Sequence, residues 1–74
     1  MNLFPVLKTV FPHLDENNYN VHLQMGDIPG WDSMNSVNLQ MEIESCFLVD
    51  ISGFVISNKT TVEDILGIID KKLY

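Results

Sequence analysis

The chain has no arginine and only four lysines among its 74 residues. Ten Asp and Glu residues leave a formal net charge of −6 at pH 7. Proteins bind nucleic acids through basic side chains that displace phosphate counterions, and helices that bind anionic membrane surfaces are rich in Lys and Arg. The charge balance therefore argues against a nucleic acid or a membrane as partner and favours a protein with a basic surface.

Cysteine is also scarce, because Cys46 is the only one. An intramolecular disulfide is excluded, and a cysteine-based zinc site would lack ligands. The first five residues form no basic leader, and no run approaches the roughly 20 apolar residues of a membrane span. With 46% apolar residues, a chain of 74 residues has enough for one core but not for an enclosed catalytic cleft as well. We expect one cytoplasmic domain over residues 1–74.

The first and last apolar segments have the periodicity of α-helices. In the first, Pro12 ends the pattern near residue 10 or 11. The polar stretch over residues 15–31 predicts an irregular loop with at most one helical turn near residues 21–25. The last segment begins with a capping box at Thr60–Glu63, which precedes one apolar stripe. That stripe consists of Val62, Ile65, Leu66, Ile69 and Leu73.

A middle helix is predicted to begin at Asp32 and Ser33, because Asp is a favourable N-cap and Ser33 then lies in the first turn. Its apolar residues form two stripes on nearly opposite sides. One stripe is Met34, Val37 and Met41, and the other is Leu39, Ile43 and Phe47. Two opposed stripes are typical of a helix packed between neighbours, so we predict a central helix.

The sequence of residues 47–56 does not distinguish between a strand and a helix. Their β-branched side chains favour a strand by local propensity, but a lone strand in this chain would have no partner. The alternative is a loop followed by a short helix capped by Ser52.

No catalytic or metal-binding constellation is visible. His13 and His22 have no carboxylate or thiolate at ligand spacing. Asp32 and Ser33 lack the Gly-x-Ser-x-Gly context of a hydrolase nucleophile. Glu42 and Glu44 are two residues apart on a helix and point about 200° away from each other. We therefore predict neither catalytic residues nor a metal site.

Ser33 remains the most informative residue. One interpretation is that Asp32 and Ser33 simply begin a helix. The other is that an exposed hydroxyl beside free backbone N–H groups is a favourable place for a covalently attached phosphate, which those groups stabilise. Because no base is nearby, another enzyme would have to activate the serine.

The segment Gly30–Val37 resembles the phosphopantetheine attachment site of acyl carrier proteins, in which Asp-Ser-Leu or Asp-Ser-Met begins the second helix. The run from Leu39 to Phe47 continues that pattern, and the spacing from Asp32 to Thr60 matches the family without a gap. The resemblance covers the second half of the chain well. The first half agrees in length and helix placement.

The resemblance implies a small all-α, four-helix bundle with three main helices and a short third helix over residues 52–58. It also implies that a phosphopantetheinyl transferase attaches 4′-phosphopantetheine from coenzyme A to Ser33. The thiol of the arm would hold an acyl group as a thioester. The implied partners are an acyl-loading ligase or acyltransferase and downstream synthase enzymes, which a monomeric carrier would serve.

The sequence also departs from the fatty-acid type. Carriers of that type have an acidic residue at the position of Asn35 and usually another at the position of Asn38. Both residues are neutral in this chain. We therefore expect a stand-alone carrier of a specialised pathway. We predict that partners dock on a mixed acidic and apolar surface. Its members are Asp32, Met34, Glu42, Glu44, Phe54 and Ile56.

Two alternatives stay open. The first is an aminoacyl or peptidyl carrier, including the D-alanyl carriers, because the loading enzyme and not the carrier selects the cargo. The second is a helical interaction domain that is never modified.

Overall fold

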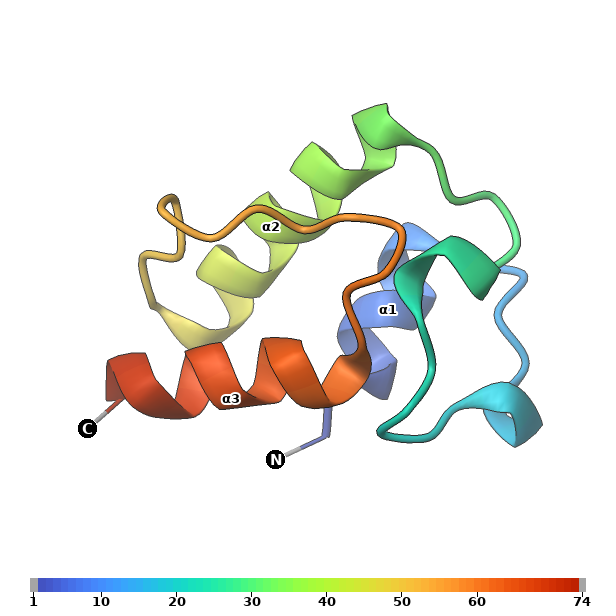
Figure 1. Ribbon diagram of the computed structural model, residues 1–74, viewed down its shortest axis with the longest axis horizontal. Coiled ribbons are helices and arrows are strands. Elements are labelled where there is room, and N and C mark those ends of the chain that lie inside the picture. Colours follow the sequence, from blue (N-terminus) through green and yellow to red (C-terminus); the bar gives the residue numbers. More distant parts are fainter. Residues whose placement is uncertain (1, 74) are drawn as a thin grey trace.

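The regular elements of the protein are helical. The computed structural model describes residues 2–73, in which α1 spans Phe4–Val10, α2 spans Ser33–Phe47 and α3 spans Val62–Leu73. Two 3₁₀ turns, Glu16–Asn18 and Met25–Asp27, lie between α1 and α2. Figure 1 shows α2 above α3, with α1 behind them and the segment before α3 crossing in front of α2. The predicted all-α class is confirmed, and none of the described helices is both long and apolar enough to cross a membrane.

Local signals define the ends of α1 and the start of α2. Helix α1 ends at Val10, as Pro12 predicts, and Asn2 Oδ1 accepts a hydrogen bond of 3.0 Å from the Phe4 N–H at its start. Asp32 caps α2, because its Oδ1 accepts a hydrogen bond of 2.8 Å from Asn35 N–H. Gly30, at a φ of 92°, adopts the left-handed conformation that turns the chain into α2.

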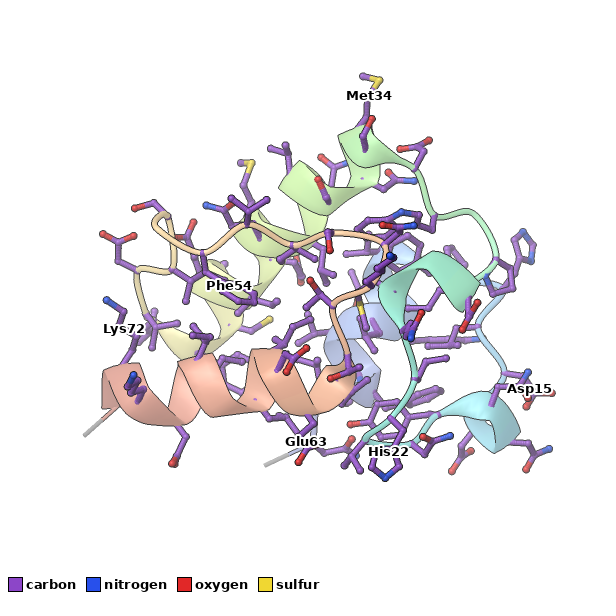
Figure 2. All side chains as sticks on the ribbon, in the orientation of Figure 1. Asp15, His22, Met34, Phe54, Glu63 and Lys72 are labelled. Atoms are coloured by element: carbon purple, nitrogen blue, oxygen red, sulfur yellow. The ribbon has the colours of Figure 1, made fainter. Side chains whose placement is uncertain are left out.

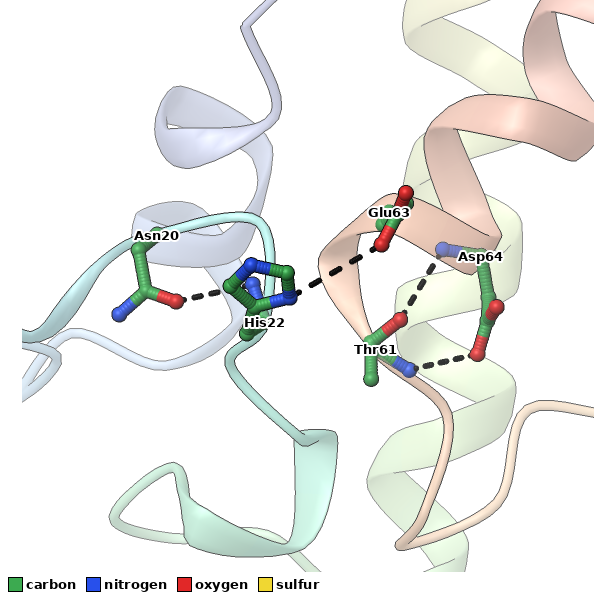
Figure 3. Close-up of polar contacts among 5 residues, drawn as sticks. All are labelled: Asn20, His22, Thr61, Glu63 and Asp64. Carbon is green, nitrogen blue, oxygen red and sulfur yellow. Dashed lines mark hydrogen bonds and ion pairs between the residues drawn. The ribbon is translucent and has the colours of Figure 1, made fainter.

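The capping box of α3 lies one residue later than predicted. Thr61 Oγ1 accepts from Asp64 N–H, and an Asp64 carboxylate oxygen accepts from Thr61 N–H, each at 3.1 Å (Figure 3). Thr60 is buried instead, and its Oγ1 accepts a hydrogen bond of 2.9 Å from Ser57 N–H. The box moves because the Thr60 hydroxyl is engaged in the turn that precedes the helix.

The loop between α1 and α2 is tied to the start of α3. Val62 N–H donates to Leu23 O at 3.0 Å, and Glu63 N–H donates to Val21 O at 2.9 Å. These are first-turn donors that have no partner inside the helix. Met25 N–H donates in turn to Thr60 O at 2.8 Å. His22 lies 3.9 Å from Glu63 as well (Figure 3), but such an exposed pair contributes at most about 1 kcal/mol.

The core combines the three helices with this loop. Ile43, Ile65 and Ile69 are buried, as the apolar stripes predict, whereas Phe47 is half-buried. Leu7 of α1 is buried as well. The other buried apolar residues are Leu3, Val6, Phe11, Leu14, Met25, Ile28, Leu39, Ile51, Ile56 and Val62. The loop thus supplies core residues although its sequence has no apolar periodicity. The side chain of Leu73, the last residue of the predicted stripe, lies outside the described side chains.

The prediction of a short helix between α2 and α3 is wrong. Ser52 N–H donates to Asp50 Oδ1 at 2.9 Å, and Phe54 N–H donates to Ile51 O at 2.9 Å, so residues 50–54 form turns. The hydrogen bond from Ser52 N–H also lowers the pKa of the Asp50 carboxyl. Gly53 and the following β-branched residues have low helix propensity, and residues 55–60 are irregular. The described chain therefore has three α-helices instead of the four of the expected bundle.

We expect Ile69→Ala to lower the free energy of unfolding by about 2–5 kcal/mol, because it leaves a cavity at a fully buried position. Urea unfolding followed by circular dichroism measures this loss. Val55→Ala, at a position that is 82% exposed, is the matched apolar control and should change stability little. Equal midpoints for the two variants would contradict this placement of the core.

Candidate functional site

Ser33 is the first residue of α2, and it is exposed. The Asp32 carboxylate occupies Asn35 N–H, while the N–H groups of Ser33 and Met34 are first-turn donors without a partner inside the helix. Ser36, one turn later, donates its hydroxyl to Ser33 O at 2.6 Å. Within residues 2–73 the Ser33 hydroxyl makes no comparable hydrogen bond, so the two serines differ in availability.

An open groove of about 480 Å³ adjoins Ser33. Its lining consists of Gly26, Trp31, Ser33, Ser36, Ile56, Ser57 and Asn58. This lining contains no histidine, cysteine or carboxylate, and no cluster of metal-binding side chains occurs among the described residues. The groove can hold a ligand beside Ser33, but it offers no base to activate the hydroxyl.

The face of α2 that begins beside Ser33 is apolar and open to solvent. Met34 is 79% exposed, Val37 55% and Met41 63%. The expectation that α2 is packed on both sides is therefore wrong, because the rest of residues 2–73 covers only the face of Leu39 and Ile43. We call Met34, Val37 and Met41 the α2 outer face. Figure 2 shows Met34 at the tip of the molecule, pointing into solvent.

Comparisons with known proteins identify the family. No family model and no solved structure matches the chain. The curated "Acyl carrier protein" of Phytoplasma australiense is 35% identical over 60 residues, which cover 81% of this chain and 79% of that protein. The chain belongs to the acyl carrier protein family. Acyl carrier proteins are carriers and not enzymes.

In this acyl carrier protein fold, the predicted docking residues have different surroundings. Asp32 is exposed at the start of α2, next to Met34. Glu42 is half-buried, and its Oε1 lies 3.5 Å from Cys46 Sγ. Partial desolvation of the sulfur and the neighbouring Glu42 carboxylate raise the pKa of the Cys46 thiol, so the thiol is protonated at neutral pH. The carboxylates of Asp32 and Glu42 are the acidic groups of the predicted docking set near the α2 outer face.

Glu44 has a structural contact that the sequence did not reveal. Its Oε2 accepts a hydrogen bond of 3.0 Å from the N–H of Ile51, a residue that is only 1% exposed. The half-buried Glu44 carboxylate thus holds the chain where it turns back after α2. We leave Glu44 out of the surface offered to partners.

The apolar residues after α2 also differ in exposure to solvent. Val55 is exposed, Phe54 is half-buried, and Ile56 is buried at 6% exposure. Ile56 belongs to the core, so we remove it from the predicted docking patch. Phe54 stays a predicted contact. Val37 and Met41 lie on one helical face with Met34, as their spacing predicts, but they were expected to be packed and were not among the predicted docking residues.

We expect Glu44→Ala to destabilise the protein by about 1–3 kcal/mol, because it leaves the buried N–H of Ile51 without its acceptor. Urea unfolding monitored by circular dichroism measures the loss. Glu42→Ala is the control, since Glu42 is also half-buried on α2 but accepts only a weak thiol contact. If Glu42→Ala cost as much as Glu44→Ala, the structural role of the Glu44 carboxylate would be refuted.

Proposed function

We propose that Ser33 carries 4′-phosphopantetheine and that the chain presents an acyl group, bound as a thioester to the thiol of this arm, to partner enzymes. A phosphopantetheinyl transferase would form the bond between Ser33 Oγ and the pyrophosphate phosphorus of coenzyme A that bears the pantetheine group. The pyrophosphate bond breaks, adenosine 3′,5′-bisphosphate leaves, and the transferase accepts the hydroxyl proton. When attached, the arm supplies a flexible thiol for thioester chemistry.

The observation that carries this proposal is the state of Ser33 in a member of the acyl carrier protein family. Its hydroxyl is exposed at the start of a 15-residue helix and is free of intramolecular hydrogen bonds within residues 2–73. The free N–H groups and the positive end of the α2 dipole stabilise a phosphate there. The residues around Ser33 therefore fit an attached phosphodiester, while activation of the hydroxyl falls to the transferase.

Partner enzymes would dock on the α2 outer face. Its three apolar side chains extend from Ser33 along the helix, with Asp32 and Glu42 as nearby acids. No lysine or arginine occurs between Lys8 and Lys59, whereas seven carboxylates do. Such an acidic surface accelerates encounters with basic partners. We propose that charge guides the approach and that burial of the apolar face holds the complex.

The neutral side chains of Asn35 and Asn38 support the proposal that the partners belong to a specialised pathway. Asn38 Nδ2 donates to Asn35 Oδ1 at 3.1 Å, and Asn35 Nδ2 donates to Gly30 O at 2.8 Å. These neutral amides tie α2 to the turn before it and leave two fewer charges near the attachment site. Docking would therefore depend more on apolar contacts than it does in carriers with acids at these positions.

Attachment at Ser33 is tested by incubating the protein with coenzyme A, Mg²⁺ and a promiscuous phosphopantetheinyl transferase. We expect the intact mass to increase by one phosphopantetheine group, and Ser33→Ala to abolish the increase. Ser36→Ala is the matched control and should be modified normally, because its hydroxyl is already bonded to Ser33 O. Modification of Ser33→Ala would refute Ser33 as the attachment residue. No mass change in the wild type, while a control carrier is loaded, would refute the carrier proposal and favour an unmodified interaction domain.

Docking on the α2 outer face is tested with Met41→Ala. Loss of a methionine contact of about 1.4 kcal/mol should raise the transferase KM about tenfold. Leu48→Ala is the control, because Leu48 is 88% exposed but lies just beyond the other end of α2. A smaller effect of Met41→Ala than of Leu48→Ala, with both variants folded, would contradict this docking surface.

A further inference from the structure

The methionines of the described chain are divided between the core and the open face of α2. Met25 is fully buried in the 3₁₀ turn Met25–Asp27. Met34 and Met41 are exposed and lie about two helical turns apart on the α2 outer face. In Figure 2 the Met34 thioether projects from the tip of the molecule. A small oxidant in solution therefore reaches two thioether sulfurs of the α2 outer face but not the sulfur in the core.

Cys46 is the other oxidisable side chain of α2, and it is exposed as well. At 100° per residue, it lies roughly 120–140° around the helix from Met34 and Met41. Desolvation and the Glu42 carboxylate raise the pKa of its thiol, which slows oxidation because the thiolate is the reactive form. Oxidation of Cys46 would thus leave the α2 outer face unchanged.

Oxidation of a methionine makes this face polar without adding a charge. One oxygen atom of hydrogen peroxide is transferred to the thioether sulfur, so that an S–O bond forms and the O–O bond breaks. The sulfur is oxidised by two electrons, and the second oxygen leaves as water with both protons. The product, methionine sulfoxide, accepts hydrogen bonds from water. A partner that covers the oxidised face must remove that water, which costs free energy unless the partner supplies a donor.

The fold accommodates this change because both side chains point away from the core. The buried face of the same helix consists of Leu39 and Ile43, and neither residue contains sulfur. Met41 lines an open groove of about 510 Å³ between α1 and α2, together with Asn38 and Ser45. The groove has space for one more oxygen atom, and its polar side chains are compatible with a sulfoxide. Oxidation therefore alters the surface and not the core.

On these grounds, and resting on the proposed docking of partner enzymes on the α2 outer face, we propose that Met34 and Met41 are reversible oxidation sites through which a peroxide weakens binding of those partners. Two of the three apolar side chains of this face become polar, and only Val37 stays as it was. A methionine sulfoxide reductase reverses the change, because two electrons and two protons from a dithiol restore the thioether and release the oxygen as water.

The test uses the Cys46→Ser protein, so that thiol oxidation makes no contribution. The protein is treated with hydrogen peroxide, the excess is removed with catalase, and the added oxygen is located by peptide mass spectrometry. We expect Met34 and Met41 to gain one oxygen each while Met25 stays reduced, because only the first two are exposed. The urea midpoint should not change.

Docking of the oxidised protein is measured as the KM of a promiscuous phosphopantetheinyl transferase. We expect this KM to rise at least about tenfold, because two apolar contacts are lost. Treatment with methionine sulfoxide reductases and a dithiol should restore the original KM. The control combines Met34→Leu with Met41→Leu, which keeps the side chains apolar but removes both thioethers. The ratio of its KM after and before peroxide should be about 1, because leucine is not oxidised.

Each failure has a distinct result. Oxidation of Met25 as fast as that of Met34 and Met41, or an equal rise in KM for the leucine variant, would overturn the proposal. If Met34 and Met41 are oxidised and KM is unchanged although Met41→Ala raises it, the oxidation sites have no effect on docking and the docking surface stands. If Met41→Ala leaves KM unchanged too, the docking surface fails and this proposal fails with it. If the untreated protein is not loaded, the carrier proposal itself fails.

Discussion

The hydrogen bonds between the first long loop and the start of α3 are the constraint on which the rest of the structure depends. Leu23 and Val21 supply the acceptors that Val62 and Glu63 need at the N-terminus of the helix, and Met25 N–H binds Thr60 in return. The same pairing continues to Gly26 and Asn58. A polar loop thereby becomes one wall of the core and also positions one side of the groove at Ser33.

That arrangement explains why α2 is covered on one face only. The loop, α1, α3 and the segment before α3 meet over the face of Leu39 and Ile43, and nothing in the described chain remains to cover Met34, Val37 and Met41. Exposed apolar surface of this kind is typical of interaction sites. In this member of the acyl carrier protein family, the exposed apolar face lies beside the candidate attachment serine.

Two side-chain hydrogen bonds distinguish residues that stabilise the fold from residues of the same type whose side chains remain accessible. Glu44 supports the turn after α2 through Ile51 N–H, while Glu42 on the same helix makes only a weak contact to Cys46. Likewise, Ser36 donates to Ser33 O, while the Ser33 hydroxyl is exposed. Residues of the same type and nearly the same position thus differ because hydrogen bonding occupies one member of each pair.

The sequence by itself determined the features that depend on neighbouring residues. Pro12 ends α1, Asp32 begins α2 at Ser33, and the apolar stripe of α3 identifies Ile65 and Ile69 as core. Only the tertiary structure decided the burial of Met25 and Ile56 and the open face of α2. Those outcomes depend on hydrogen bonds and packing between segments more than 30 residues apart, such as that of Gly26 with Asn58. Local propensity and periodicity contain no information about such contacts, so the groove beside Ser33 could not be read from the sequence.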